Sequence, residues 1–502
     1  MKNDFDVIII GGGATGLGCA VEAQSRGYKT LLLEARDYGS GTSSKSTKLV
    51  HGGIRYLANL DFALVKEGLE ERHYFLQNAP HLAHRQSYLI PFHNFYESLQ
   101  YHLGIWLYDF LAGKLKVGKS RFLSKHQALA EAPDMNPKRI CGGGIYFDGQ
   151  FDDTRMLITL LKTFEALGGI AHNYTPVVGF IEDQAKITGV KTQAGDVFQA
   201  KVIINATGIF TDQLTDLAEP GVVHHEVEPA QGTHLVFDKE IFDCKHALVI
   251  PKTVDGRILF VLPWHDKVLV GTTDVEMAHP DENPIPQHQE VDLILSTFSA
   301  YTKHPVTRAD IRSQFAGQRP LVKPAHSQNS KKVSRKHEIL ETRNGLISIV
   351  GGKWTIYRRM GQDTIDYAVK QQKLAASVSD TKNHLLFGAG ELCQAYPLSV
   401  YGAAYHDILA IQEAQNNFAT LHPSLPYLQA EVIYQVQQEQ AKTIEDVLAR
   451  RTRALFLDAK AAIDAAPLVA KLMAAELKKD QAWVEQELQT FHAIAKTFLV
   501  VL

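Results

Sequence analysis

The hydrophobic and polar pattern near the amino terminus predicts a nucleotide-binding β-α-β unit. An apolar run at residues 7–10 leads into three glycines at G-x-G-x-x-G spacing: Gly11, Gly13 and Gly16. A helix of small residues and a second apolar run, 30–33, follow, and that run ends at Glu34. In such a unit the glycines allow a tight turn close to a pyrophosphate, the helix N-terminus faces the phosphates, and the acid binds a ribose hydroxyl. We therefore expect this segment to bind a dinucleotide.

The later periodicity predicts a mixture of helices and strands. Helical patterns run from Asp61 to Asn78, from Met156 to Leu167, and from Ile356 to about Lys370. β-type patterns occur at 176–182, 187–192 and 197–204, over most of 227–318, and again at 345–350. Beyond Leu392 the pattern is helical to the end.

This order predicts an α/β protein with three domains. A chain of 502 residues exceeds the size at which one core usually stops growing. We assign residues 1–80, 145–226 and 336–385 to a discontinuous nucleotide-binding domain. Residues 81–144 and 227–335 are assigned to an inserted substrate domain with an antiparallel sheet, and 392–502 to a helical carboxyl-terminal domain.

The charge and cysteine content exclude several functions. The 52 basic and 55 acidic residues give a formal net charge of −3, so the overall charge provides no attraction for nucleic acid. The cysteines form no C-x-x-C pair, and we expect four buried, reduced thiols: Cys19, Cys141, Cys244 and Cys393. The adjacent pairs His224–His225 and Asp152–Asp153 would face apart on a strand, so no metal site is predicted.

The hydropathy pattern predicts a protein that faces the cytoplasm. The first strand begins within ten residues of the start, which leaves no room for a signal peptide. No apolar run approaches the roughly 20 residues that a membrane-spanning helix needs.

Two segments after Glu34 give the chain a specific resemblance. Residues 41–44 are Gly-Thr-Ser-Ser, and residues 51–57 are His-Gly-Gly-Ile-Arg-Tyr-Leu. With the glycine motif, these segments resemble the FAD-dependent glycerol-3-phosphate dehydrogenases. Similar motifs lie at 206–208, 231–234 and 443–453, so the likeness spans essentially the full length. The resemblance implies a Rossmann-like FAD-binding domain of the glutathione-reductase-like type.

The family resemblance and the glycine motif together give an expected FAD-binding set. Its members follow the first two strands, the small-residue strand end at 206–208, and the glycine loop that opens the 356–370 helix. They are Gly11, Gly13, Ala14, Thr15, Gly16, Glu34, Ala35, Thr42, Ser43, Ser44, Ser46, Lys48, Leu49, His51, Gly52, Gly53, Val177, Ala206, Thr207, Gly208, Gly351, Gly352, Lys353, Trp354 and Thr355.

Cations beside these motifs are suited to a phosphate-bearing substrate. A compact dianion favours guanidinium donors and a point charge, and we expect Arg55, Arg319, Arg335 and Lys353 to converge on it. Tyr56, Thr272 and Thr273 are expected hydroxyl contacts. Oxidation of a secondary alcohol also needs a base, for which His234 is the candidate. The expected catalytic residues are therefore His234, Arg319, which could also hold a developing alkoxide, and Lys353, beside the flavin.

The resemblance implies oxidation of sn-glycerol 3-phosphate to dihydroxyacetone phosphate, with hydride transfer to FAD and electrons passed to quinone. It also implies a peripheral protein, expected to be a dimer, on the inner face of the cytoplasmic membrane. The aromatic and basic segment 99–121 is one candidate for the membrane contact. The alternative for this segment is a packed helix followed by a solvated turn.

Three other functions remain open at this point. An oxidase of the same family would pass electrons to oxygen and give peroxide, although that branch often carries a long insertion that is not evident here. An amino-acid or amine oxidase of related fold would need an apolar pocket, whereas several cations suggest phosphate. A non-catalytic scaffold would have lost the flavin, which the intact glycines argue against.

Overall fold

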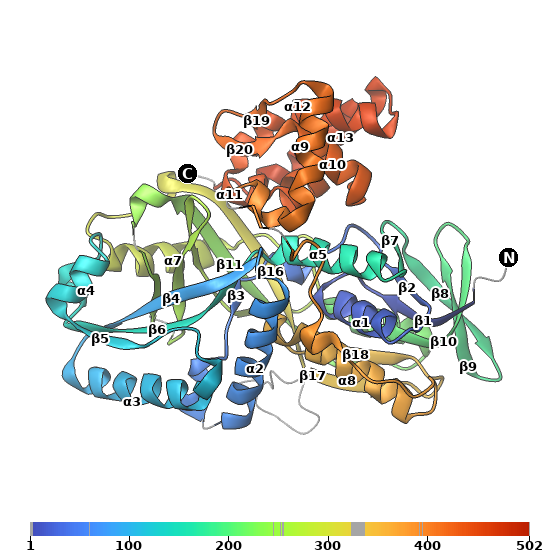
Figure 1. Ribbon diagram of the computed structural model, residues 1–502, viewed down its shortest axis with the longest axis horizontal. Helices are drawn as coiled ribbons and strands as arrows, with labels where there is room; N and C mark the ends of the chain where they lie inside the picture. Colours follow the sequence, from blue (N-terminus) through green and yellow to red (C-terminus); the bar gives the residue numbers. More distant parts are fainter. Residues whose placement is uncertain are drawn as a thin grey trace.

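Two sheets lie side by side, and a helical unit stands above the middle of the molecule (Figure 1). The structure, a computed structural model, describes residues 4–500 except 60, 244, 252, 254–255, 323–336, 391 and 394, and leaves the side chains of Arg55, Ala58 and Asn59 undescribed. The predicted α/β architecture, with an inserted sheet and a helical carboxyl-terminal domain, is confirmed.

The nucleotide-binding sheet has a parallel centre. The strand order is β17-β18-β10-β1-β2-β7, and the β8–β9 hairpin joins it at β10. Its strands are β1 (Asp4–Ile10), β2 (Thr30–Leu33), β7 (Ile170–His172), β8 (Val177–Asp183), β9 (Lys186–Thr192), β10 (Val197–Asn205), β17 (His337–Glu341) and β18 (Ile347–Gly351). The strands expected at 176–182, 187–192 and 197–204 are thus confirmed within one residue at their ends.

Both faces of this sheet are covered, which explains why its central strands are apolar throughout. Val7 and Ile9 pack under α1 (Ala14–Ser25), α5 (Asp153–Ala166) and α8 (Tyr357–Lys370). Ile8 and Ile10 point to the opposite core, which α6 (Thr211–Ala218) closes. The carboxyl ends of β1 and β2 therefore open together beside the amino end of α1.

The substrate sheet has ten strands and is antiparallel except where β12 pairs with β4. Its long strand pairs are β4 with β6 and β11 with β16. The strands are β3 (Leu49–Val50), β4 (Ala83–Phe92), β5 (Arg121–Ser124), β6 (Gly142–Phe151), β11 (Val227–Asp238), β12 (Ala247–Ile250), β13 (Leu259–Trp264), β14 (Lys267–Gly271), β15 (Val275–Glu276) and β16 (Ile311–Val322).

Strand β6 moves one predicted domain boundary. The expected division between residues 144 and 145 falls inside β6, which pairs along its whole length with β4 of the substrate sheet. The chain returns to the nucleotide-binding domain at α5, whose first turn is capped by Asp152. Strand β6 begins with three glycines, and an added Cβ at Gly143 would lie 2.8 Å from Leu89 Cδ1 of the neighbouring strand.

Helices flank the substrate sheet on both sides. These are α2 (Phe62–Asn78), α3 (Phe95–Ala112), α4 (Lys125–Glu131) and α7 (His288–Tyr301). The predicted helix from Asp61 is confirmed, with the Asp61 carboxylate accepting from Leu64 N. The mostly β-type interpretation of 227–318 missed α7, which packs Ile294 and Phe298 against the sheet.

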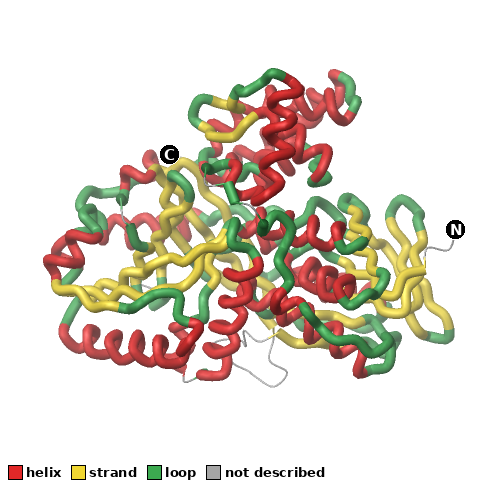
Figure 2. The backbone as a smooth tube through the Cα atoms, viewed as in Figure 1, coloured by secondary structure: helices red, strands yellow, loops and turns green. Residues whose placement is uncertain are grey.

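The carboxyl-terminal domain is mostly helical, with one short hairpin (Figure 2). It comprises η11 (Leu398–Ala404), α9 (Tyr405–Gln415), β19 (Thr420–His422), β20 (Leu425–Leu428), α10 (Gln429–Gln438), η12 (Asp446–Arg451), α11 (Ala454–Leu457), α12 (Ala459–Leu477) and α13 (Gln481–Lys496). The η12 segment is π-helical. Thr443 and Asp446 cap the start of this segment reciprocally, since Asp446 N donates to Thr443 Oγ1 and Thr443 N donates to Asp446 Oδ2.

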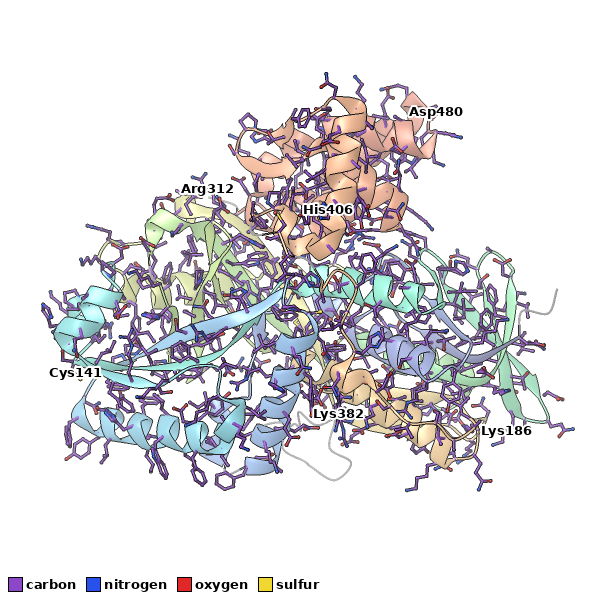
Figure 3. The ribbon with its side chains drawn as sticks, viewed as in Figure 1. Cys141, Lys186, Arg312, Lys382, His406 and Asp480 are labelled. Carbon is purple, nitrogen blue, oxygen red and sulfur yellow. The ribbon has the colours of Figure 1, made fainter. Side chains whose placement is uncertain are left out.

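Two sequence expectations about the surface are also tested. Cys19 is buried, but Cys141 is exposed at the outer edge of the substrate sheet, so the expectation of four buried thiols is wrong (Figure 3). Cys141 immediately precedes β6, where the chain turns at the surface; Cys244 lies outside the described residues. In the described part of the chain, no helix has both the length and the apolar character required to cross a bilayer.

Candidate active site

A cavity of about 850 Å³ is lined by residues of both sheets. One end is formed by the amino terminus of α1 and the end of β2, and the other by β11, β16 and the residues 272–274 that follow β14. The loop between β2 and β3, residues 34–48, crosses between these two ends. The size suits a large cofactor together with a small substrate, since ligand sites commonly enclose about 300–1,000 Å³.

Glycines shape the nucleotide end of the cavity as the motif predicts. Gly11 has φ +110°, and a Cβ there would lie 2.6 Å from the Ala206 carbonyl oxygen. A Cβ on Gly16 would lie 1.8 Å from the carbonyl oxygen of Gly11, so α1 can approach β1 only with glycine at this position. The Glu34 carboxylate accepts from Gly12 N at 2.5 Å and from Arg36 N at 2.9 Å. Burial raises the pKa of Glu34, and these two N–H donors oppose that shift.

The remaining walls fit an extended FAD molecule. Ala14 N at the start of α1 donates to Ser43 Oγ, Thr42 Oγ1 donates to the Gln318 carbonyl, and Trp354 Nε1 donates to the Ser43 carbonyl. These bonds hold the loop open around the cavity. Added Cβ atoms at Gly41 and Gly208, which both line it, would meet no atom within 4 Å. The donor-rich helix end and this open cradle are what a dinucleotide with a pyrophosphate requires.

The guanidinium of Arg319 lies in the substrate half. Arg319 stands on β16 opposite Ala230 of β11, and its Nη2 donates to Thr272 Oγ1 at 3.0 Å. Its Nη1 donates to Asp274 Oδ1 at 3.2 Å. A Cβ on Gly232 would come within 2.2 Å of Nη2, so the glycine of the 231–234 motif makes room for this side chain.

His234 is buried in the same half. Its Nε2 lies 3.0 Å from Thr47 Oγ1, and its ring stacks on Phe315 with centroids 5.0 Å apart. Burial lowers the pKa of His234 well below 6.5, and the charges of Lys48 and Arg319 lower it further. The imidazole is therefore neutral at physiological pH and able to accept a proton.

Lys353 lines the cavity in the glycine loop that follows β18. Gly351 and Gly352, with φ of +74° and +77°, turn the chain from β18 toward η9 (Trp354–Ile356) and α8. Lys353 Nζ lies 5.0 Å from the centroid of the Tyr56 ring. Tyr56 stands behind Lys353 and does not itself line the cavity.

Most of the predicted set converges on the cavity, and a few members lie behind its wall. Thr272 and Thr273 line it, and Thr273 also donates to the buried Glu290 carboxylate. The side chain of Arg55 and the whole of Arg335 lie outside the described residues. The predicted cofactor residues that do not line the cavity are Gly16, Ser44, Lys48 and Gly52.

Lys48 is the clearest correction. Its Nζ is fully buried, forms an ion pair with Asp153 and donates to the Ser44 carbonyl, so the side chain points away from the cavity. Burial lowers the pKa of Lys48 to about 7, which Asp153 partly opposes. A lysine in a loop of hydroxyl residues suggested a phosphate ligand, but here it contributes to the core between domains.

Sequence reasoning missed an aromatic and acidic part of the wall. Tyr88 and Tyr146 face each other across β4 and β6 with ring centroids 5.1 Å apart. Asp148 follows on β6; it accepts from Arg72 Nη1 at 2.7 Å and from the Tyr108 hydroxyl. Tyr88, Tyr146 and Asp148 line the cavity. Because they alternate along one strand pair, the period-2 pattern of β6 could have indicated that they share a face.

Comparisons with known proteins agree with this geometry. A family model described as FAD dependent oxidoreductase matches residues 6–358, and one described as C-terminal domain of alpha-glycerophosphate oxidase matches residues 347–484. The mitochondrial glycerol-3-phosphate dehydrogenase of Rattus norvegicus is 36% identical over 97% of this chain and 72% of its own length. A probable enzyme of the same name from Caenorhabditis elegans is 36% identical over 99% of this chain and 73% of its own length.

Solved structures extend the agreement to three dimensions. Glycerol-3-phosphate dehydrogenase from Bacillus halodurans, complexed with FAD, has a TM-score of 0.81 and 28% identity, covering 99% of this chain and 96% of that one. L-alpha-glycerophosphate oxidase from Mycoplasma pneumoniae, 19% identical with a TM-score of 0.59 over 73% of this chain and 94% of that one, shares the fold. From its sequence, its fold and the cavity that joins its two sheets, the chain belongs to the FAD-dependent glycerol-3-phosphate dehydrogenase family.

Proposed function

We propose that this protein oxidises sn-glycerol 3-phosphate to dihydroxyacetone phosphate and passes the electrons to a membrane quinone. The observation that carries the proposal is that one cavity joins the dinucleotide motif to Arg319, His234 and Lys353. A phosphate-binding cation, a neutral base and a second cation are the groups that this oxidation requires.

Arg319 is proposed to bind the substrate phosphate. Its side chain is a quarter exposed, so a ligand in the cavity can reach it. Thr272 Oγ1 accepts a hydrogen bond from Arg319 Nη2, which fixes the orientation of the guanidinium plane. A fork of N–H donors matches two phosphate oxygens, and each charge-assisted hydrogen bond contributes about 1.5–3 kcal/mol.

His234 is proposed to remove the hydroxyl proton. When bound, FAD accepts the hydride from the carbon that carries this hydroxyl. His234 takes up the proton at Nε2, the nitrogen beside the Thr47 hydroxyl. Phe315 and the buried position hold the ring in place, and the low pKa keeps it neutral before the reaction.

Lys353 is proposed to favour negative charge in its part of the cavity. It stands directly before η9 and α8, whose amino end carries partial positive charge. A fixed positive charge at a site sheltered from water stabilises developing negative charge without reorganisation during the reaction.

The main test of the proposed function is anaerobic reduction of the bound flavin by the substrate. Purified protein should be yellow, and glycerol 3-phosphate should bleach it without oxygen, whereas glycerol should not. Bleaching by amino acids instead of the phosphoester would favour an amine oxidase, and a colourless protein that cannot be reconstituted would favour a scaffold.

The acceptor is tested on the same sample. Quinone reduction should be fast relative to peroxide production when both are measured with glycerol 3-phosphate as donor. Peroxide formation at the rate of substrate oxidation, with no quinone reduction, would assign the protein to the oxidase branch. A homodimer is proposed on the family resemblance alone, and light scattering measures it.

Helix α3 supports peripheral binding to the membrane. Six large apolar side chains on it are 61–83% exposed: Phe95, Tyr96, Leu99, Leu103, Trp106 and Phe110. The exposed Lys114, Lys116 and Lys119 follow in the next segment. An apolar helix face beside cations suits an interface with anionic lipid. We propose that this face lies on the inner surface of the cytoplasmic membrane.

Vesicle sedimentation tests the contact. Replacing Lys114, Lys116 and Lys119 with glutamine should release the protein from anionic vesicles. The matched control replaces Lys186, Lys191 and Lys201, three exposed lysines at the other end of the molecule, and should sediment like the wild type. Equal sedimentation of both variants would count against α3.

A further inference from the structure

We propose that the carboxyl-terminal domain retains FAD through three arginines that fix the cofactor loop from behind. The cofactor loop is residues 36–48, and the three residues, here termed the arginine clamp, are Arg450, Arg451 and Arg453. This inference concerns cofactor retention and does not depend on the identity of the substrate or the electron acceptor.

The cofactor loop has two faces with different partners. On its inner face, residues 39–43 and 45–47 line the cavity. On its outer face, Asp37, Tyr38, Ser44 and Lys48 are buried. The outer face packs toward the carboxyl-terminal domain: the Tyr38 hydroxyl, for example, donates to Gln440 Oε1 at 3.1 Å. The shape of the inner face therefore depends on contacts that a bound cofactor does not make.

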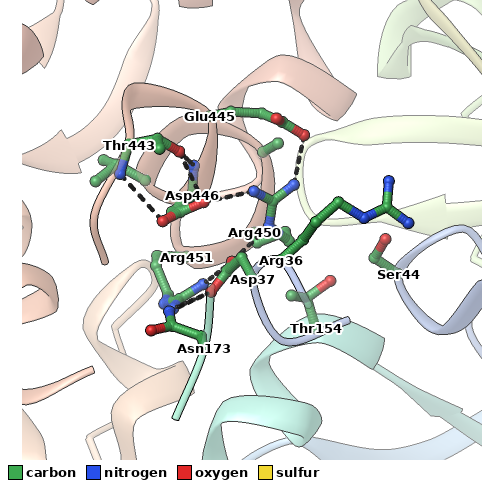
Figure 4. A network of polar contacts seen from close by, with 12 residues as sticks. Arg36, Asp37, Ser44, Thr154, Asn173, Thr443, Glu445, Asp446, Arg450 and Arg451 are labelled. Carbon is green, nitrogen blue, oxygen red and sulfur yellow. Dashed lines mark hydrogen bonds and ion pairs between the residues drawn. The ribbon is translucent and has the colours of Figure 1, made fainter. Parts of the chain in front are cut away.

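The clamp attaches to the start of the loop through Asp37. Arg451 donates to both carboxylate oxygens of Asp37, from Nη1 at 2.6 Å and from Nη2 at 2.8 Å. Arg450 donates to the same carboxylate from Nε at 2.5 Å (Figure 4). Burial alone would raise the pKa of Asp37, but Arg451 and Arg450 outweigh it and lower the pKa to about 2.

The clamp attaches to the end of the loop through Arg453. Its Nη2 donates to the Ser44 carbonyl at 2.9 Å, and its Nη1 donates to Thr154 Oγ1 at 2.7 Å. It also lies 3.4 Å from Asp153, the carboxylate that binds Lys48 and the Ser46 hydroxyl. Arg453 thus holds Ser44, which lies between two residues that line the cavity, Ser43 and Lys45. Ser43 Oγ accepts from the first N–H of α1.

The local backbone brings these side chains to one place. Residues 446–451 are π-helical, and Thr452 N donates to the Val447 carbonyl five residues earlier. Such segments often occur at functional sites in place of a regular helical turn. Arg450 and Arg451, although adjacent, therefore both reach Asp37, and Asp446 holds Arg450 through a bond of 2.6 Å.

A second ion pair across the same interface provides a control that distinguishes a clamp on the cofactor loop from simple docking of the two domains. Arg155 of α5 forms a bidentate pair with Glu439, with both bonds at 2.8 Å. It connects the same two domains and is equally buried, but among the described residues the Arg155 side chain makes no hydrogen bond or ion pair with the cofactor loop. Glu439 also contacts the clamp, since its carbonyl accepts from Arg451 Nη2 at 2.8 Å, so the control change is made at Arg155. Weakening the pair from that side should disturb docking without moving the loop.

The test measures FAD release from the purified holoenzyme. Arg451→Lys and Arg453→Lys keep the charge but lose the forked geometry, and Arg155→Lys is the matched control. We expect the two clamp variants to release FAD at least tenfold faster, measured as the rise of free flavin fluorescence on dilution, and the control to stay within about twofold. Equal acceleration in all three would reduce the effect to docking, and unchanged rates in the clamp variants would overturn the proposal.

Amide hydrogen exchange tests the same coupling without mutation. Because coupling between two sites is reciprocal, FAD that is held through the clamp must in turn stabilise the clamp. Adding FAD to the stripped full-length chain should slow exchange in residues 446–453 as well as 36–48, with no change in α13. Protection confined to 36–48 would contradict the proposal even where a variant fails to fold.

Discussion

Two groups of cations lie about the same loop and differ in how their charge is balanced. At the carboxyl-terminal interface Arg450, Arg451 and Arg155 are buried against the carboxylates of Asp37 and Glu439. In the cavity Arg319 donates to Thr272 Oγ1, the Thr273 carbonyl and Asp274, and its side chain remains a quarter exposed. A cation that is paired and buried holds the structure together, whereas one that is accessible from the cavity can bind an anion. The residue type alone does not distinguish the two.

The largest effect is expected from Arg319→Ala, which removes the accessible cation. Loss of two charge-assisted bonds of about 1.5–3 kcal/mol each predicts a decrease of roughly 10²- to 10⁴-fold in kcat/KM for glycerol 3-phosphate, mainly through KM. Steady-state kinetics measure it, with glycerol as the substrate that lacks a phosphate. Arg312→Ala, an exposed arginine on the same strand that pairs with Asp238, is the control and should leave KM unchanged (Figure 3). Equal losses with both substrates would refute a phosphate role for Arg319.

A smaller and different effect is expected from His234→Gln. Glutamine can still bond Thr47 but cannot take up a proton, so kcat should fall about 10²-fold with little change in KM. In the wild type, burial keeps the pKa of His234 well below 6.5, so the neutral base persists on mild acidification. The acid limb of kcat should therefore lie below pH 6.5 and vanish in the variant. An unchanged kcat would remove His234 from the reaction.

The contrast between the two groups also explains what the sequence could predict. The glycine motif, Glu34 and the continuous apolar run of β1 are local signals, because a tight turn and a doubly covered strand restrict the residue types at each position. Gly232 and Arg319 are far apart in sequence, and only the pairing of β11 with β16 brings them together. The family resemblance supplied that long-range information.

Lys48 shows where sequence reasoning failed, and the reason is the partner rather than the residue. Its position among hydroxyls suggested a cofactor ligand, but its counter-ion, Asp153, lies 105 residues later on α5. The arginines at 450–453 were visible only as part of a family motif, since their partner Asp37 is more than 400 residues away. Helix α7 was missed because it lies within a long β-type region, and its buried face is defined by the sheet beneath it.

The smallest effect is expected at Glu431, a buried carboxyl group of the carboxyl-terminal domain that accepts no hydrogen bond from an arginine among the described residues. Its oxygens accept from Tyr401 and from Leu428 N, and burial raises its pKa from 4.5 to about 7. Because the folded state binds this proton more tightly than the unfolded state, stability is retained below about pH 4.5 and decreases as the pH rises to about 7. Asp37, with its pKa lowered to about 2, has the opposite sign and loses its contribution only below about pH 4.

Glu431→Gln should remove this decrease. The stability advantage of the variant over the wild type should grow by about 2–3 kcal/mol from pH 5 to pH 8, since one pKa unit corresponds to 1.36 kcal/mol. Denaturant unfolding of the holoenzyme at several pH values measures the difference. Glu439→Gln, which breaks the matched pair with Arg155, is the contrasting control and should be less stable than the wild type at every pH. Parallel pH profiles for wild type and Glu431→Gln would show that Glu431 is ionised in the folded protein, and that carboxylates of the interface are stable without a matched cation.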